Sequence, residues 1–172
     1  MSFLARIFGE KEDREALGPL YAAVVAAGRD PAWFRQGQVP DTLDGRFDMI
    51  AALLTLVLLR LEADGDSGRR ASVVLTERFI DDMDGTVRQM GIGDLMVGKH
   101  VGRMMSALGG RLTAFRAAGQ GDLGEPVARN VFRDAVPSPE ALAFVSGRLE
   151  RYRDALQATP SQALLDGEMP SL

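Results

Sequence analysis

The sequence predicts an all-α protein, a single-domain helical bundle of about six or seven helices. Three observations predict it: apolar residues recur at helical three-and-four spacing, no segment alternates as a strand would, and no internal repeat divides the chain. With 172 residues and 46% hydrophobic content, the chain is long enough to bury one core. We expect the helical domain at residues 17–159, between an apolar and charged N-terminal segment (1–16) and a C-terminal tail (160–172).

Composition excludes several functional classes. The chain has no cysteine and a single histidine, His100, which rules out disulfide frameworks, thiolate catalysis, zinc ribbons and histidine-rich metal sites. Its net charge of -4 and its scattered basic residues provide no basic face for nucleic acid. Its apolar runs fall far short of the roughly 20 residues that a membrane-spanning helix requires. We therefore expect no metal, no cofactor, no catalytic residues and no nucleic-acid partner.

Residues 1–9, MSFLARIFG, form a short apolar segment. A secretory signal needs an apolar run of about 7 to 15 residues followed by a small-residue cleavage site, and this segment has neither. We therefore expect a cytoplasmic protein. The aromatic and aliphatic residues of the segment recur at helical spacing. This fits either a terminal turn packed against the helical domain or a segment that makes peripheral contact with a membrane or a partner.

The first predicted helix begins near Gly18, where Pro19 suits the first helical turn, and it ends at Gly28. A short turn then carries Trp33 and Phe34. Because these side chains are large, we expect them to close one end of the core.

The segment 47–61 is apolar nearly all round, and Asp48 is the first of only three polar interruptions. This pattern is typical of a helix surrounded by other helices, so we expect it to be the central core element. Either Asp41 or Thr42 can cap its N-terminus. The segment 63–68 is rich in glycine and aspartate and is predicted to be a loop.

The next predicted helix, residues 69–90, turns a broad apolar face to the core and carries three aspartates elsewhere. Gly91 is suited to end this helix. Asp94 is suited to cap the helix that follows.

The helix after Asp94 contains a stripe of small residues at every fourth position, Gly98, Gly102, Ser106 and Gly110. Glycine inside a helix costs about 1 kcal/mol relative to alanine, so the stripe indicates that another backbone approaches closely. Lys99 and Arg103 flank it. Two occupants fit, the protein's own segment 49–61 and a hydrophobic membrane helix of a client. Compact bundles routinely place small residues at helix crossings, which favours the internal occupant.

The C-terminal third begins with residues 117–125, which are predicted to be a flexible link, and continues with a short helix at 126–135. Ser138 is a suitable N-cap for a last helix with strict three-four apolar spacing. The C-terminal tail is expected to fray, apart from Leu164 and Leu165.

Two segments imitate ligand sites. Residues 93–100 resemble a phosphate-binding P-loop, but His100 stands where Ser or Thr would hold magnesium, and a helix is expected before it instead of a strand. Residues 81–85 are similar to a calcium loop with the wrong acidic spacing. They are also similar to the aspartate-rich motif of all-α prenyl-diphosphate enzymes, which needs a second cluster that this chain lacks. An all-α enzyme or carrier for a prenyl-diphosphate or lipid ligand is the alternative function, and a solvated or partner-binding acidic face is favoured.

Five runs stand out in order along the chain: VPDTLDGRF at 39–47, RFIDDMD at 78–84, MGIGDL at 90–95 with VGK at 97–99, Gly110-Arg111, and RNV at 129–131. Together they resemble the ubiquinol–cytochrome c chaperone family. The resemblance implies an α-helical, non-enzymatic chaperone that binds newly made cytochrome b and helps it to enter the cytochrome bc1 complex. Mitochondrial members act with a small partner protein at the ribosome. Because its start is unlike a transit peptide, this chain resembles a bacterial, cytoplasmic member, with peripheral contact at the inner membrane as a further expectation.

We expect two sets of partner-binding residues. The first is a polar patch of Asp41, Asp44, Arg46, Asp81, Asp82 and Asp84. Dense carboxylates repel one another and need a positive or hydrogen-bonding partner, which cytochrome b or another hydrophobic membrane-protein client would supply. The second set is Asp94, Gly98, Lys99, Gly102, Arg103 and Arg111. Internal pairing with arginines such as Arg78 and Arg88 is the alternative for the aspartates on the 69–90 helix.

Overall fold

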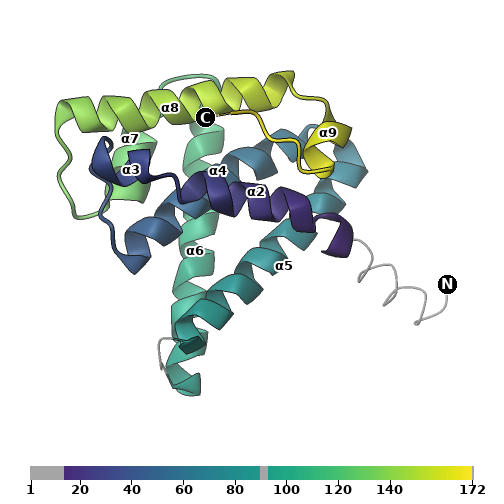
Figure 1. Cartoon of the computed structure of the whole chain (residues 1–172), viewed down its shortest axis with the longest axis horizontal. Coiled ribbons are helices and arrows are strands. Elements are labelled where there is room, and N and C mark those ends of the chain that lie inside the picture. Colours follow the sequence, from purple (N-terminus) through teal and green to yellow (C-terminus); the bar gives the residue numbers. More distant parts are fainter. Residues whose placement is uncertain (1–13, 90–92, 172) are drawn as a thin grey trace.

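The computed structural model describes residues 14–89 and 93–171, and these residues form a single all-helical bundle without strands (Figure 1). The predicted fold class is therefore confirmed. The long helices are α2 (Gly18–Gly28), α4 (Leu43–Glu62), α5 (Gly65–Gln89), α6 (Asp94–Ala118) and α8 (Pro139–Ala158). The short helices are α3 (Pro31–Arg35), α7 (Gly124–Val127) and α9 (Ser161–Leu165), and a π-helical turn, η1 (Ala128–Phe132), follows α7 directly.

Helix α4 is the central element, as its apolar sequence predicts. It packs against α2, α5, α6, α8 and η1, and 14 of its 20 residues are buried. The buried hydroxyl of Thr55 donates a hydrogen bond to the Ala51 carbonyl at 2.7 Å, so this polar group costs the core little. The other long helices therefore form a shell around α4.

Side-chain caps set the N-termini of three helices. The Thr42 hydroxyl accepts a hydrogen bond from the Gly45 N–H at 3.1 Å, and the Ser138 hydroxyl accepts one from the Ala141 N–H at 3.2 Å. Each satisfies a backbone donor that the first helical turn leaves free. Both caps are confirmed, and Thr42 is the residue that caps α4. Asp30 caps α3 in the same way.

Helix α3 closes one end of the core with Trp33, as predicted. The indole is fully buried, and its N–H donates to the Ala27 carbonyl at 2.8 Å. The guanidinium of Arg148 stacks on its face, 4.3 Å from the ring centroid. Phe34, the second aromatic residue of this turn, is only partly buried.

Glycines allow close contacts at two helix boundaries, and one of these boundaries differs from the sequence prediction. α2 ends at Gly28 as expected, but a Cβ there would lie 2.7 Å from the Ile50 side chain, so the glycine allows α2 to approach α4. The predicted loop at 63–68 is wrong, since α5 already begins at Gly65. A Cβ at Gly68 would meet the Leu61 carbonyl oxygen at 1.8 Å, so only glycine allows the tight α4–α5 turn.

The C-terminal third is more ordered than predicted. The link after α6 is held by Arg153 of α8, whose guanidinium donates to the carbonyls of Gly119, Gln120 and Gly121 at 2.8 to 3.2 Å. The tail forms α9, where Leu164 is fully buried. Leu164 is one of the two residues excepted from the expected fraying, and its burial agrees with that exception. The contacts of Arg153 give the link more fixed partners than its sequence predicts.

Helices α5 and α6 form a long hairpin. Figure 1 shows the end of α5 and the start of α6 converging beyond the ends of the other helices. Gly93 occupies the N-cap position of α6 and Asp94 is its first residue, so the prediction of Asp94 as the cap is wrong by one position. The predicted C-cap, Gly91, lies outside the described residues. No helix in the described part of the chain is long and apolar enough to cross a membrane.

Candidate partner-binding surfaces

The first candidate surface is the start of α4, where Asp41, Asp44 and Arg46 are all exposed. Arg46 donates a hydrogen bond to Asp41 at 2.7 Å, and this guanidinium lowers the pKa of the Asp41 carboxyl. The carboxylate beside Arg46 therefore stays charged down to a more acidic pH. Asp44 lies within electrostatic reach of Arg133.

The aspartates of α5 each have a partner inside the protein. Asp81 forms an ion pair with Arg14, and Asp84 accepts from Arg88 at 2.6 Å. Asp82 accepts from the hydroxyl of Tyr21 at 2.8 Å; burial, followed by this hydrogen bond, raises the pKa of Tyr21 well above its usual range. Internal pairing, the alternative interpretation of these residues, is therefore present in the structure, although with Arg14 and Tyr21 as well as the predicted Arg88.

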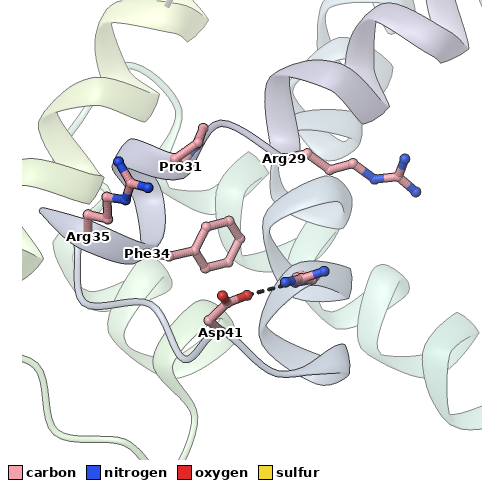
Figure 2. A pocket seen from close by; sticks show the side chains of 6 residues that line it. Arg29, Pro31, Phe34, Arg35 and Asp41 are labelled. Carbon is pink, nitrogen blue, oxygen red and sulfur yellow. Dashed lines mark hydrogen bonds and ion pairs between the residues drawn. The ribbon is translucent and has the colours of Figure 1, made fainter.

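Two neighbouring hollows are lined by some of these residues. One has a volume of about 310 Å³ and is lined by Arg29, Pro31, Phe34, Arg35, Asp41 and Arg46 (Figure 2). The other has a volume of about 410 Å³ and contains Asp81 and Asp82 beside Arg14 and Arg78. Arg29 lines both hollows, so the structure brings four of the six predicted patch residues onto adjoining surface. Asp44 and Asp84 line neither hollow.

The aspartates of α5 do not converge in an apolar cavity. Asp81 and Asp82 line a surface hollow whose other charged groups are arginines. Within residues 14–89 and 93–171, no group of three or more metal-binding side chains could hold an ion. The P-loop-like segment follows a helix, α5, as the sequence predicts.

The small-residue stripe of α6 faces outward. Gly98, Gly102, Ser106 and Gly110 are exposed, and a Cβ built at any of the three glycines meets nothing within 4 Å. The favoured prediction, that the stripe seats the protein's own segment 49–61, is therefore wrong. Lys99 and Arg103 are also exposed, and Met96 on the same helix is 45% exposed. The side chain of Asp94 lies outside what the structure describes.

Arg111 differs most from its predicted role. Its side chain is 1% exposed, as is that of Asp48, and the two form an ion pair at 2.8 Å. The same guanidinium donates to the Asn130 carbonyl. A surface contact between Arg111 and a partner is therefore excluded in this structure. A lone aspartate in an otherwise apolar helix was the sequence signal for this pair, but nothing local identified its partner.

Arg133 completes the buried network. It follows the π-helical turn with a positive φ of 52°, and it donates to the same Asp48 oxygen at 2.6 Å. Non-glycine residues hold such a backbone only where surrounding contacts fix it, and this ion pair is one such contact. Burial raises the pKa of Asp48, and the two guanidinium groups oppose that rise. The network joins α4, α6 and η1, beside three of the runs that carry the family resemblance.

Comparisons with known proteins agree with that resemblance. The sequence profile of the ubiquinol-cytochrome C chaperone family matches residues 35–171. The crystal structure of the Cbp3 homolog from Brucella abortus is similar with a TM-score of 0.80 at 26% sequence identity, over 99% of this chain and 97% of that one. No curated protein matches the sequence significantly. Because the family profile spans most of the chain, the protein belongs to the ubiquinol-cytochrome C chaperone family.

Proposed function

We propose that this protein is a non-enzymatic assembly chaperone that binds cytochrome b and assists biogenesis of the cytochrome bc1 complex. The observation that carries this proposal is family membership over residues 35–171. The fold of the Cbp3 homolog from Brucella abortus, which this chain shares along nearly its whole length, supports it. We place the protein in the bacterial cytoplasm, at the inner membrane where such a client inserts. The proposed membrane contact, residues 1–9, lies outside the described residues.

The outward stripe of α6 is the surface that we assign to the client. Without side chains beyond Cα at Gly98, Gly102 and Gly110, a client helix can approach the α6 backbone closely. Membrane helices pack through such small-residue stripes because no large side chain separates the backbones. Lys99 and Arg103 can donate to polar groups at the end of such a helix.

The polar patch is the second surface that we assign to recognition. Asp41, Asp81 and Asp84 of this patch already form ion pairs within the protein, so a client must compete with these exposed pairs. An exposed ion pair contributes only about 0–1 kcal/mol to stability, so replacing the internal arginine by a cation of the client costs little free energy. Asn replacements at Asp81, Asp82 and Asp84 are expected to leave the protein folded and weaken its retention of the client. Unchanged retention would make the patch a solvated surface only.

The test of the client surface compares wild-type protein with the Gly102→Leu variant. Each is crosslinked and pulled down from native cells together with their membranes, and the copurified cytochrome b is measured. The leucine projects into open space, so the melting temperature is expected to stay near that of wild type while cytochrome b recovery falls. Gly147→Leu is the matched control, since a Cβ there meets only the Arg151 guanidinium at 3.6 Å, on α8.

Two results would contradict the assignment. Wild-type levels of cytochrome b with Gly102→Leu would remove α6 from the client interface. Absence of cytochrome b from the wild-type pull-down, under conditions that retain other membrane proteins, would contradict the proposed client itself.

The described hollows support the chaperone over a prenyl-diphosphate or lipid enzyme. A diphosphate site would need converging carboxylates in a deep apolar cavity. Here α4 fills the centre of the bundle, and the hollow that contains Asp81 and Asp82 is open, with a lining of arginines and a tyrosine.

A further inference from the structure

The hollow of about 310 Å³ between the end of α2, α3 and the start of α4 contains arginines that neither the fold nor the α6 stripe explains. Figure 2 shows Phe34 at its centre, with Arg35 on one side, Arg29 on the other and Asp41 below. The Asp30 cap and the buried Trp33 hold the turn of α3 that places these groups.

Charge is the unusual feature of this hollow. Its lining contains three guanidinium groups and one carboxylate, and that carboxylate pairs with Arg46. The guanidinium groups of Arg29 and Arg35 have neither a hydrogen bond nor an ion pair within the part of the chain that the structure describes. In a chain of net charge -4, most other arginines do find a carboxylate, as Arg60 and Arg148 do. Arg35 therefore lies beside Phe34 without a carboxylate partner among the described residues, while the long side chain of Arg29 lines the other side and extends its guanidinium away from the ring, toward the hollow that contains Tyr21 (Figure 2).

We propose that this hollow, here called the arginine hollow (Arg29, Pro31, Phe34, Arg35, Asp41 and Arg46), binds an acidic peptide segment of a protein partner. The planar guanidinium fork matches a carboxylate and can donate two parallel hydrogen bonds to it. The ring of Phe34 and the side chain of Pro31 form an apolar floor for a residue beside the acidic one. The volume suits one or two side chains.

The surroundings favour a peptide over a lipid surface. Beyond Arg29 lie Asp81 and Asp82, and the chain as a whole is acidic. A flat anionic bilayer would bring many phosphates against these carboxylates, whereas a single acidic side chain can enter the hollow without meeting them. The inference does not depend on cytochrome b being the client. Its site is distinct from the α6 stripe, and it shares Asp41 and Arg46 with the polar patch.

The probe is an array of fluorescein-labelled peptides in which Glu alternates with Leu or Phe, each paired with a copy that has Gln for Glu. Fluorescence anisotropy measures their affinity for the full chain. We expect the Glu peptides to bind, the Gln copies to bind much more weakly, and added salt to weaken the Glu peptides. Arg29→Ala and Arg35→Ala are each expected to weaken binding about tenfold. Both side chains are exposed, so these variants are expected to fold as wild type does.

Matched controls separate the arginine hollow from overall charge. Arg151→Ala removes an exposed arginine on α8 and is expected to leave affinity unchanged. Asp41→Asn frees Arg46 and is expected to tighten binding several-fold, by the loss of a competing carboxylate. Asp154→Asn removes an equally exposed carboxylate, paired with Arg153, and is expected to have no effect.

Several results would overturn the proposal. These are a failure of every Glu peptide to bind, equal binding of the Gln copies, or equal losses with Arg151→Ala and Arg35→Ala. Arg35-dependent binding of inorganic phosphate alone would mean an anion site without peptide recognition. Arg35-dependent cosedimentation with phosphatidylglycerol vesicles, and not with phosphatidylcholine vesicles, would assign the hollow to a membrane if the peptides fail.

Discussion

Replacing Asp48 by Ala is expected to destabilise the protein severely. The substitution would leave the Arg111 guanidinium buried without its carboxylate. Two of its nitrogens, Nε and Nη1, already lack a hydrogen-bond partner among the described residues. Breaking a buried pair by removing one member costs about 3–5 kcal/mol, because an uncompensated charge remains in the interior. For a chain of 172 residues, roughly 2–4 °C per kcal/mol predicts a fall in melting temperature of about 6–20 °C.

The assay is thermal and urea denaturation followed by circular dichroism. Asp66→Ala is the surface control, because Asp66 and Arg69 form a pair with both side chains mostly exposed. Its cost is expected to stay below about 0.5–1 kcal/mol. Removing both buried charges with Asp48→Leu and Arg111→Met together should cost less than Asp48→Ala alone.

Two outcomes would refute this reasoning. A cost below about 1 kcal/mol for Asp48→Ala would show that water or rearrangement compensates Arg111 readily. A double variant at least as unstable as the sum of the single ones would show that the two charges are not coupled through their pair.

Three further predictions follow from the glycines, the α3 cap and the site composition. Gly102→Ala should stabilise the protein by up to about 1 kcal/mol in urea denaturation, since alanine improves helix propensity and its Cβ meets nothing there. Gly28→Ala should destabilise the protein, because its Cβ would lie 2.9 Å from the α4 backbone. The opposite order of stabilities would contradict the packing described. The Ala32 N–H and then Arg148 lower the pKa of Asp30, so its contribution to stability is present above about pH 4 and is lost as pH falls through the lowered pKa; acid unfolding followed by tryptophan fluorescence should shift in Asp30→Asn. Calorimetry with magnesium ATP and with zinc should show no micromolar binding, and a stoichiometric signal from either would argue against a non-enzymatic chaperone.

Local chemistry made much of this fold predictable from sequence. The apolar stretch of α4 has no side that tolerates water, so it had to be central. Thr42 and Ser138 cap their helices because the cap is a hydrogen bond across three residues, which sequence order nearly determines. The five runs likewise identified the family before any contact was known, since a run is a local pattern.

Contacts between distant segments decided the rest. Asp48 and Arg111 are 63 positions apart, and nothing near either one specifies the other; only the crossing of α4 and α6 makes them partners. The glycine stripe of α6 illustrates the same limit. Spacing showed that Gly98 and Gly102 share a face, but the rotation of α6 about its axis sets whether that face meets α4 or solvent.

The arginine hollow could not be predicted from sequence, because it too is formed by segments that only the tertiary structure brings together. Arg29, Arg35 and Arg46 come from α2's end, α3 and α4, and none belongs to a charged run. Sequence by itself therefore determined the helices, their caps and the family, because these depend on neighbours along the chain. Which charges are buried together, and which faces stay open to a partner, was decided only by tertiary packing, because these depend on how the helices rotate and cross.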